Sequence, residues 1–236
     1  MNILDDILKV NKEAFTETLK KLKFVPILAM ILFVFKIAEF YILFALTGYN
    51  QASSFILGFV RAAVSIAFLS ALISFLADIV IYNRLDFNNF LNRFSEYFSP
   101  LMNTYFIIFL IEMVVNMLFG ALPRVISLII SIALLVLQSP LYEEVYLGNT
   151  YGMDAVYSAF DFIKENFLQW LPVLIAYVLI EYVFSFWSII MVFDLRLIIQ
   201  SILYGLLLAF VYIYKGQLFK ILNGSSMRKR RFQGKF

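Results

Sequence analysis

The chain has 236 residues, of which 63% are hydrophobic and 15% are charged, and its net charge is +3. Soluble proteins are typically about 45–50% apolar and about 25% charged, so a soluble domain of this length could not bury so much apolar surface. The sequence contains no Cys and no His, which excludes disulfides, thiolate and imidazole metal ligands, and mechanisms that use histidine as a base. We therefore expect an integral membrane protein without a metal or cofactor.

The first 23 residues are charged and carry apolar residues at helical spacing. The apolar positions are Leu4, Leu8, Phe15, Leu19 and Leu22. This pattern predicts an amphipathic helix. The apolar block that follows is too long for the core of a cleaved signal peptide, so we expect the N-terminal segment to be retained.

Six apolar blocks then approach the length of about 20 residues that a membrane-spanning helix needs. They cover residues 24–47, 55–81, 101–120, 121–141, 168–192 and 195–214. The breaks at 120–124 and 194–196 are short, and the count would fall to five or four if either turn did not form. The predicted fold is all-α and polytopic, with about six transmembrane helices in three hairpins, 24–81, 101–141 and 168–214.

Two further segments, 85–99 and 152–167, each precede a hairpin and alternate apolar and polar residues at helical spacing. Both are predicted to be amphipathic helices at the cytoplasmic surface, like the N-terminal one. The remaining segment, 215–236, is predicted to be a basic cytoplasmic tail.

Most Lys and Arg residues fall in the termini and in the segments between the hairpins. Positive residues in short segments stay on the cytoplasmic side, which predicts that both termini are cytoplasmic. The tail can also bind anionic lipid headgroups, each basic residue contributing about 1 kcal/mol. Its candidate headgroup contacts are Arg228, Lys229, Arg230 and Arg231. Nucleic-acid binding is not expected of so short a tail beside a membrane.

An internal repeat is indicated when residues 95–114 are superimposed on residues 164–183, because each range has a Phe followed at the same spacing by a Glu. The first hairpin has a similar pair, Phe24 and Glu39, one residue further apart. We interpret the chain as three copies of one unit, each an amphipathic helix and a hairpin. The alternative is chance similarity between apolar helices, which share a small alphabet.

Ionisable residues inside the predicted spans are the leading site candidates, since a charge near the bilayer centre costs at least about 2.5 kcal/mol. Glu39, Glu112 and Glu181 lie about 12 to 15 residues into their spans, at or beyond the midplane for a rise of about 1.5 Å per residue. The predicted partners of the glutamates are Lys36, Arg61, Arg124 and Arg196. Together they form either a polar binding site or a set of ion pairs that fixes helix packing.

Three further polar residues lie within the predicted spans, and we expect them to form hydrogen bonds between helices. They are Asp78, Asn116 and Gln200.

Glu143 and Glu144 follow the fourth span in a predicted cytoplasmic connection. They invite comparison with glutamic intramembrane proteases, but that chemistry needs an Arg where this chain has Gly148, and it needs histidines. The sequence predicts no enzyme.

From Ser139 to Phe167 the chain resembles a family of bacterial six-span proteins, the membrane domain of glycerophosphodiester phosphodiesterases and related stand-alone proteins. The matching positions are Pro140, Gly148, Gly152, Asp154, Ala155, Ser158, Phe160, Lys164, Asn166 and Phe167. The resemblance implies a six-span fold in the bacterial inner membrane. It does not imply phosphodiesterase activity, because the catalytic barrel of such proteins is a separate soluble domain.

Two functions follow from these patterns. The first is a non-catalytic membrane component that organises lipid or docks a protein partner at the cytoplasmic face, through its amphipathic helices and basic tail. The alternative is a transporter or ligand-binding protein with a polar site built from the intramembrane Glu and Arg residues.

Overall fold

The computed structural model describes residues 3–47, 54–119, 124–185, 195–223 and 225, and for some residues beside the gaps it describes the backbone alone. The long elements within these ranges are all helical, which confirms the all-α class. They are α1 (Ile3–Leu19), α2 (Val25–Thr47), α3 (Ser54–Ala77), α4 (Phe90–Phe119), α5 (Arg124–Gln138), α6 (Leu141–Tyr146), α7 (Met153–Ser185) and α8 (Leu195–Leu222). A 3-10 turn, Leu22–Phe24, precedes α2, and a π-helix, Asp78–Tyr82, continues α3.

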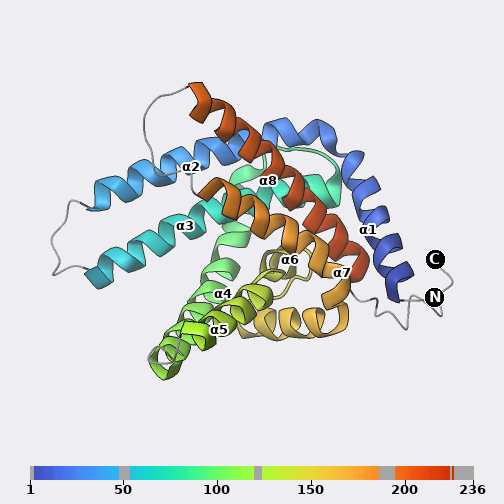
Figure 1. Cartoon of the computed structure of the whole chain (residues 1–236). Helices are drawn as coiled ribbons and strands as arrows, with labels where there is room; N and C mark the ends of the chain where they lie inside the picture. The colour runs from blue at the N-terminus through green and yellow to red at the C-terminus, as the bar shows by residue number, and fades with distance from the viewer. Residues whose placement is uncertain (1–2, 48–53, 120–123, 186–194, 224, 226–236) are drawn as a thin grey trace.

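Helix α8 crosses the middle of the molecule and packs against α1, α2 and α7 (Figure 1). Its sequence is apolar on every side, as expected of a helix surrounded by others. Leu208 and Tyr212 contribute to the core shared with α2 and α3, while Leu218 and Phe219 contribute to the core shared with α1 and α7. In Figure 1, α1 and the C-terminal end of α8 lie together at one end of the molecule, and the ends of α2 and α3 that face the 48–53 link lie at the opposite end.

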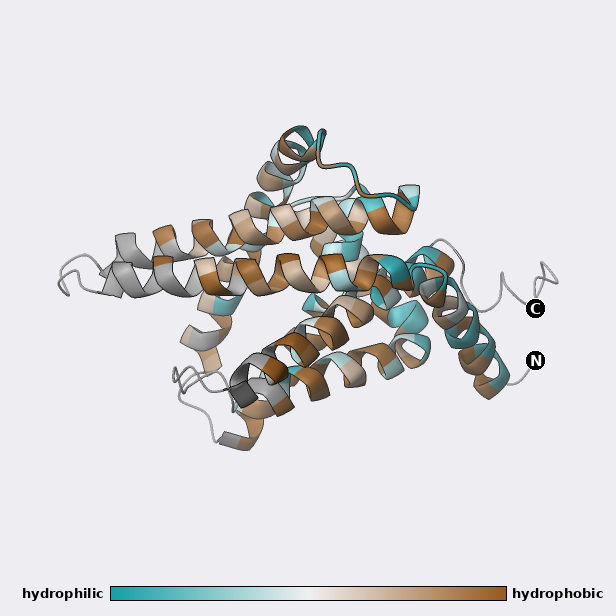
Figure 2. Ribbon diagram, turned by 90° about the horizontal axis from the view of Figure 1, so that it is seen from above, coloured by the Kyte–Doolittle hydropathy of each residue, from teal (hydrophilic) through white to brown (hydrophobic). Residues whose placement is uncertain are grey.

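Large apolar side chains are exposed along the outer surface of most of the described helices. Met117 on α4 is 86% exposed, and Val125 and Leu128 on α5 are 67% and 60% exposed. Figure 2 shows hydrophobic residues along most of the long helices, and hydrophilic residues near the marked termini and on the helix and loop at the top of the view. Such a surface is suited to lipid. The chain is therefore an integral membrane protein.

Five helical stretches in the described ranges are long and apolar enough to cross a membrane. They are Ala62–Tyr82, Phe90–Phe119, Val125–Tyr146, Met153–Val183 and Ile202–Leu222. Helix α2 matches the predicted first span within one residue. Where side chains are described without a gap, an apolar helical stretch covers Leu22–Phe35, which includes the 3-10 turn and the start of α2. Six spans and a three-unit repeat remain predictions.

The structure joins elements that the sequence analysis separated. The predicted amphipathic helix 85–99 and the third span form one helix, α4, which begins only at Phe90 and runs through Pro100. One turn further on, the Thr104 hydroxyl donates to the Pro100 carbonyl at 2.8 Å. Segment 152–167 likewise belongs to α7, which is kinked at Asn166 (φ −127°, ψ 16°), beside the predicted start of the fifth span.

The predicted fourth and sixth spans also end differently. Helix α5 stops at Gln138, and α6 begins after Pro140, whose carbonyl accepts the Glu144 N–H at 2.9 Å. Helix α8 continues to Leu222, eight residues past the predicted end of the last span at 214. The extension forms because Leu218, Phe219 and Leu222 are fully buried. The predicted tail 215–236 is thus helical in its first part.

Helix α1 buries a different face from the apolar one. Its buried residues are Asp6, Val10, Ala14 and Thr18, which are four residues apart and pack against α7 and α8. The predicted apolar positions are exposed instead, with Leu4 71% and Leu8 68% accessible. Small and polar residues therefore dock α1 on the bundle, and its large apolar residues form a separate exposed strip.

Gly216 of α8 permits a close approach to Tyr146 of α6 and to Val80 of the π-helix. A Cβ atom at this position would clash with the Tyr146 hydroxyl and lie 2.8 Å from a methyl group of Val80. The Tyr146 hydroxyl is buried, and among the described residues it has no hydrogen-bond partner.

We predict that Gly216→Ala destabilises the protein by about 1–3 kcal/mol, the usual cost of overpacking a core. Tyr146→Phe removes the clashing oxygen at little cost, so Gly216→Ala should be less harmful in a Tyr146→Phe background. The measurement is the apparent melting temperature in detergent of the unmodified protein, the two single variants and the double variant. Equal losses with and without Tyr146→Phe would contradict the packing described.

Candidate functional site

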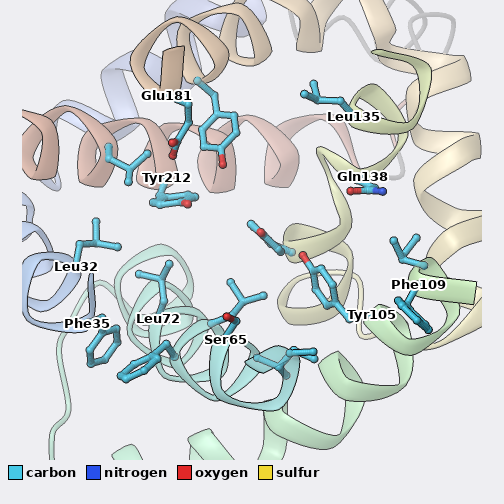
Figure 3. Close-up of a pocket in the computed structure, with 18 of the residues that line it drawn as sticks. Leu32, Phe35, Ser65, Leu72, Tyr105, Phe109, Leu135, Gln138, Glu181 and Tyr212 are labelled. Atoms are coloured by element: carbon cyan, nitrogen blue, oxygen red, sulfur yellow. The ribbon is translucent and has the colours of Figure 1, made fainter. Parts of the chain in front are cut away.

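A cavity of about 1090 Å³ lies between α2 and α3, α4 and α5, and α7 and α8. Figure 3 shows its side chains converging from opposite sides, with Leu32, Phe35 and Leu72 on one wall and Leu135 and Phe109 on another. The lining is mostly apolar. Two of the predicted intramembrane glutamates, Glu112 of α4 and Glu181 of α7, both line it.

Each of these glutamates is half-buried and accepts a hydrogen bond from the helix that follows its own. Gln138 of α5 donates its amide N–H to Glu112 Oε1 at 2.8 Å. The Tyr204 hydroxyl of α8 donates to Glu181 Oε1 at 3.0 Å. The two donors are uncharged, so these contacts position the carboxylates without neutralising them.

The other predicted site residues lie outside what the structure describes. The backbones of Lys36, Glu39, Arg61, Arg124 and Arg196 belong to helices, but their side chains are among the undescribed ones. The same holds for Asn116 and Gln200. Arg228, Lys229, Arg230 and Arg231 fall entirely outside the described ranges. Of the predicted set, Glu112 and Glu181 are the two whose side chains are described, and the structure brings them together on one cavity.

Three tyrosines line the cavity, and the sequence did not predict them as site residues. Tyr142, Tyr177 and Tyr212 line the cavity and also surround the ammonium group of Lys215. The distances from Lys215 Nζ to their ring centroids are 5.2, 5.5 and 5.9 Å, and Trp170 lies at 5.9 Å. These distances are within the range of cation–π attraction, about 6 Å.

Lys215 also forms an ion pair with Glu143 of α6, with 3.4 Å between Nζ and Oε2. The side chains are 3% and 0% exposed. Glu143 therefore lies inside the bundle, on the short buried helix α6 of the segment that was predicted to connect two spans. Apolar residues at helical spacing continue on both sides of Lys215, past residue 214. This pattern could have predicted that Lys215 lies in a buried helix.

Glu144, the second glutamate of the pair, is buried as well. The Thr150 hydroxyl donates to its Oε2 at 3.2 Å. A Cβ atom at Gly148 would lie 2.6 Å from that oxygen and 2.7 Å from the Glu144 carbonyl oxygen. The glycine at 148 thus allows the turn after α6 to close over Glu144.

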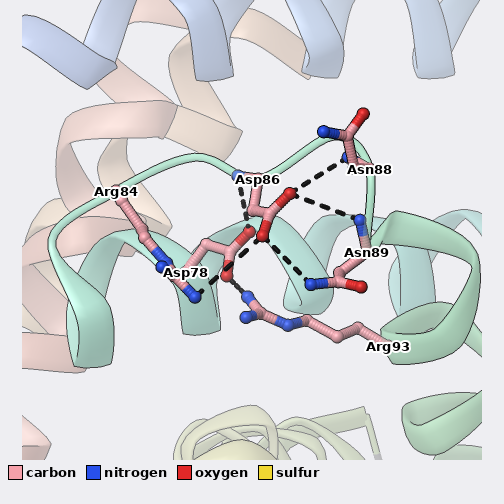
Figure 4. A network of polar contacts seen from close by, with 6 residues as sticks. All are labelled: Asp78, Arg84, Asp86, Asn88, Asn89 and Arg93. Carbon is pink, nitrogen blue, oxygen red and sulfur yellow. Dashed lines mark hydrogen bonds and ion pairs between the residues drawn. The ribbon is translucent and has the colours of Figure 1, made fainter.

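Asp78 forms a separate polar network at the end of α3 (Figure 4). It pairs with Arg93 of α4, and its Oδ2 accepts the Asp86 N–H at 3.1 Å. Asp86 in turn accepts the N–H groups of Asn88 and Asn89 at 3.1 and 3.3 Å. The expected role of Asp78 in joining helices agrees with this arrangement, which orders the link from α3 to α4.

The π-helix beside Asp78 exposes carbonyl oxygens that side chains from elsewhere satisfy. Lys21 Nζ donates to the carbonyls of Ile79 at 2.6 Å and Val80 at 3.3 Å. Burial, aided by the nearby charge of Lys220, lowers the pKa of Lys21. The segment before α2 is thereby tied to the end of α3, away from the cavity.

Comparison with known protein families, curated proteins and solved structures finds no match for this chain. The assignment of a function rests on the cavity.

Within the described ranges, acidic residues do not form a group of three that could hold a metal ion. The cavity offers instead a large apolar volume with carboxylates, an amide and phenol hydroxyls on its wall, which suits a molecule that is apolar over most of its surface and polar at one end.

We predict that Lys215→Met destabilises the protein by about 3–5 kcal/mol, because it leaves the Glu143 carboxylate buried without its counter-charge. The double variant Lys215→Met/Glu143→Gln removes both charges and should recover part of the loss. Glu165→Gln, at an exposed position of α7, is the control for a neutralised glutamate. The measurement is the apparent melting temperature of each variant in detergent. A double variant no more stable than Lys215→Met would contradict the predicted recovery.

Proposed function

We propose that this integral membrane protein binds an amphipathic molecule in the cavity between its helix pairs. The observation that carries the proposal is that Glu112 and Glu181, far apart in the sequence, line the same cavity. Among the described residues, the partners of the two glutamates are an uncharged amide and an uncharged phenol.

The size and composition of the cavity support the same proposal. Ligand cavities in proteins measure about 300–1,000 Å³ and combine an apolar lining with a few convergent polar groups. At about 1090 Å³ this cavity has room for a bulky amphiphile. Carriage of the ligand across the membrane would fit the proposed repeat, since many transporters place their sites where repeats meet.

A second role, organising lipid at the membrane surface, is favoured by α1. Leu4, Leu8, Phe15 and Leu19 form an exposed apolar strip next to the face that docks on the bundle. Exposed polar residues, among them Lys12 and Lys20, lie beside this strip. A helix with this division suits the boundary between lipid and water. We place it at the cytoplasmic surface of a bacterial inner membrane, as the family resemblance implies.

The proposed cavity predicts where an introduced cysteine will react. The chain has no cysteine, so single substitutions need no altered background. In lipid nanodiscs, Ser65→Cys on the cavity wall should react with a water-soluble methanethiosulfonate at least ten times faster than the two controls. The reason is that the reactive thiolate forms only where water reaches it.

The first control is Ile73→Cys, in the packed interior of α3, and the second is Leu128→Cys, on the exposed apolar face of α5. Slow modification of all three positions would mean that water does not reach the cavity. The proposal that the cavity binds the polar group of an amphipathic molecule would then fail.

The interfacial position of α1 is tested by an environment-sensitive fluorophore attached at Leu8→Cys. On vesicles that contain anionic lipid, its emission should shift to the blue relative to the same label at Glu13→Cys, an exposed position among the polar residues of α1. Identical emission from the two positions would show that the apolar strip is in water.

A further inference from the structure

The charge on the cavity wall points to the class of ligand. The charged side chains that the described residues contribute to the lining are both carboxylates, Glu112 and Glu181. A carboxylate in apolar surroundings favours a cation nearby and repels an anion. The charge of the described lining therefore favours a cationic group over an anionic one.

Aromatic rings supply a second, independent preference for cations. Tyr105, Phe106 and Phe109 of α4 face the same volume as Tyr177 and Tyr212. The faces of such rings attract cations, and the attraction strengthens where water is excluded. The protein already uses these rings in this way, since Tyr142, Tyr177 and Tyr212 surround the Lys215 ammonium behind the cavity.

We propose that the ligand of the cavity is an amphipathic cation, held by Glu112 and Glu181 at its charged group and by the aromatic and aliphatic lining elsewhere. This inference rests on the proposed function, because it names the class of molecule that the same cavity binds. Fatty acids and other anionic amphiphiles are rejected by the two carboxylates.

The test compares two ions of the same shape and opposite charge, tetraphenylphosphonium and tetraphenylborate. Radiolabelled ions are added to the full-length protein in phosphatidylcholine nanodiscs, and binding to empty nanodiscs is subtracted. Tetraphenylphosphonium should bind saturably and at least ten times more tightly than tetraphenylborate. A bulky thiol adduct at Ser65→Cys should abolish this binding.

Substitutions assign the selectivity to the carboxylates. Glu112→Gln and Glu181→Gln should each weaken tetraphenylphosphonium binding at least fivefold, whereas Glu165→Gln, outside the cavity on α7, should leave it unchanged. Glu181→Asp retains the charge and should bind more tightly than Glu181→Gln. The comparison of the two ions on the unmodified protein needs no variant, so it decides the question even if a substitution prevents folding.

The outcomes separate this inference from the proposed function. If tetraphenylborate binds as tightly as tetraphenylphosphonium and the Ser65 adduct blocks both, the cavity binds amphiphiles but the cation inference is wrong. Binding of the cation that is unchanged by both glutamine substitutions also overturns the inference. If the adduct removes no binding of either ion, the proposed ligand site itself is wrong.

Discussion

The ammonium group of Lys215 lies inside the bundle, and the arrangement of several elements follows from the need to compensate its charge. Glu143 can reach it only because α6 packs inward after the break at Pro140. Tyr142, Tyr177 and Tyr212 complete the surroundings of the cation and at the same time form one end of the cavity. Removing two charges from water costs several kcal/mol per ion, so such a pair persists where many other contacts hold it. The cavity is therefore shaped by the same contacts that make the buried pair tolerable.

Lipid as the surrounding medium imposes the same demand on other polar groups. Glu112 and Glu181 each receive a hydrogen bond from the next helix, and the carbonyls of the π-helix receive the Lys21 ammonium group. Polar groups that cannot turn to water must find partners within the protein. Several buried polar residues of the described helices accordingly bond to one another, and Glu112 and Glu181 do so on the wall of the cavity.

Helical spacing within long apolar blocks was sufficient to predict α2 almost to the residue. It was insufficient at the helix ends. Segment 85–99 and the third span merge into α4 because Pro100 is accommodated within the helix, and α8 extends to Leu222 because α1 and α7 cover it. The apolar pattern of α1 was recognised, but its docking face was not, since that face is made of Asp6, Val10, Ala14 and Thr18.

The sequence by itself determined the class of protein, because its long apolar blocks can span lipid as helices whose backbone hydrogen bonds are made within each segment. It also identified which acidic residues lie within the apolar blocks and so need a partner or a polar cavity. Which of these residues meet was decided by the tertiary structure. Glu143 and Lys215 are distant in the chain and belong to segments that the local pattern assigned to the cytoplasm, and only the packing of α6 beneath α8 brings them together and buries them.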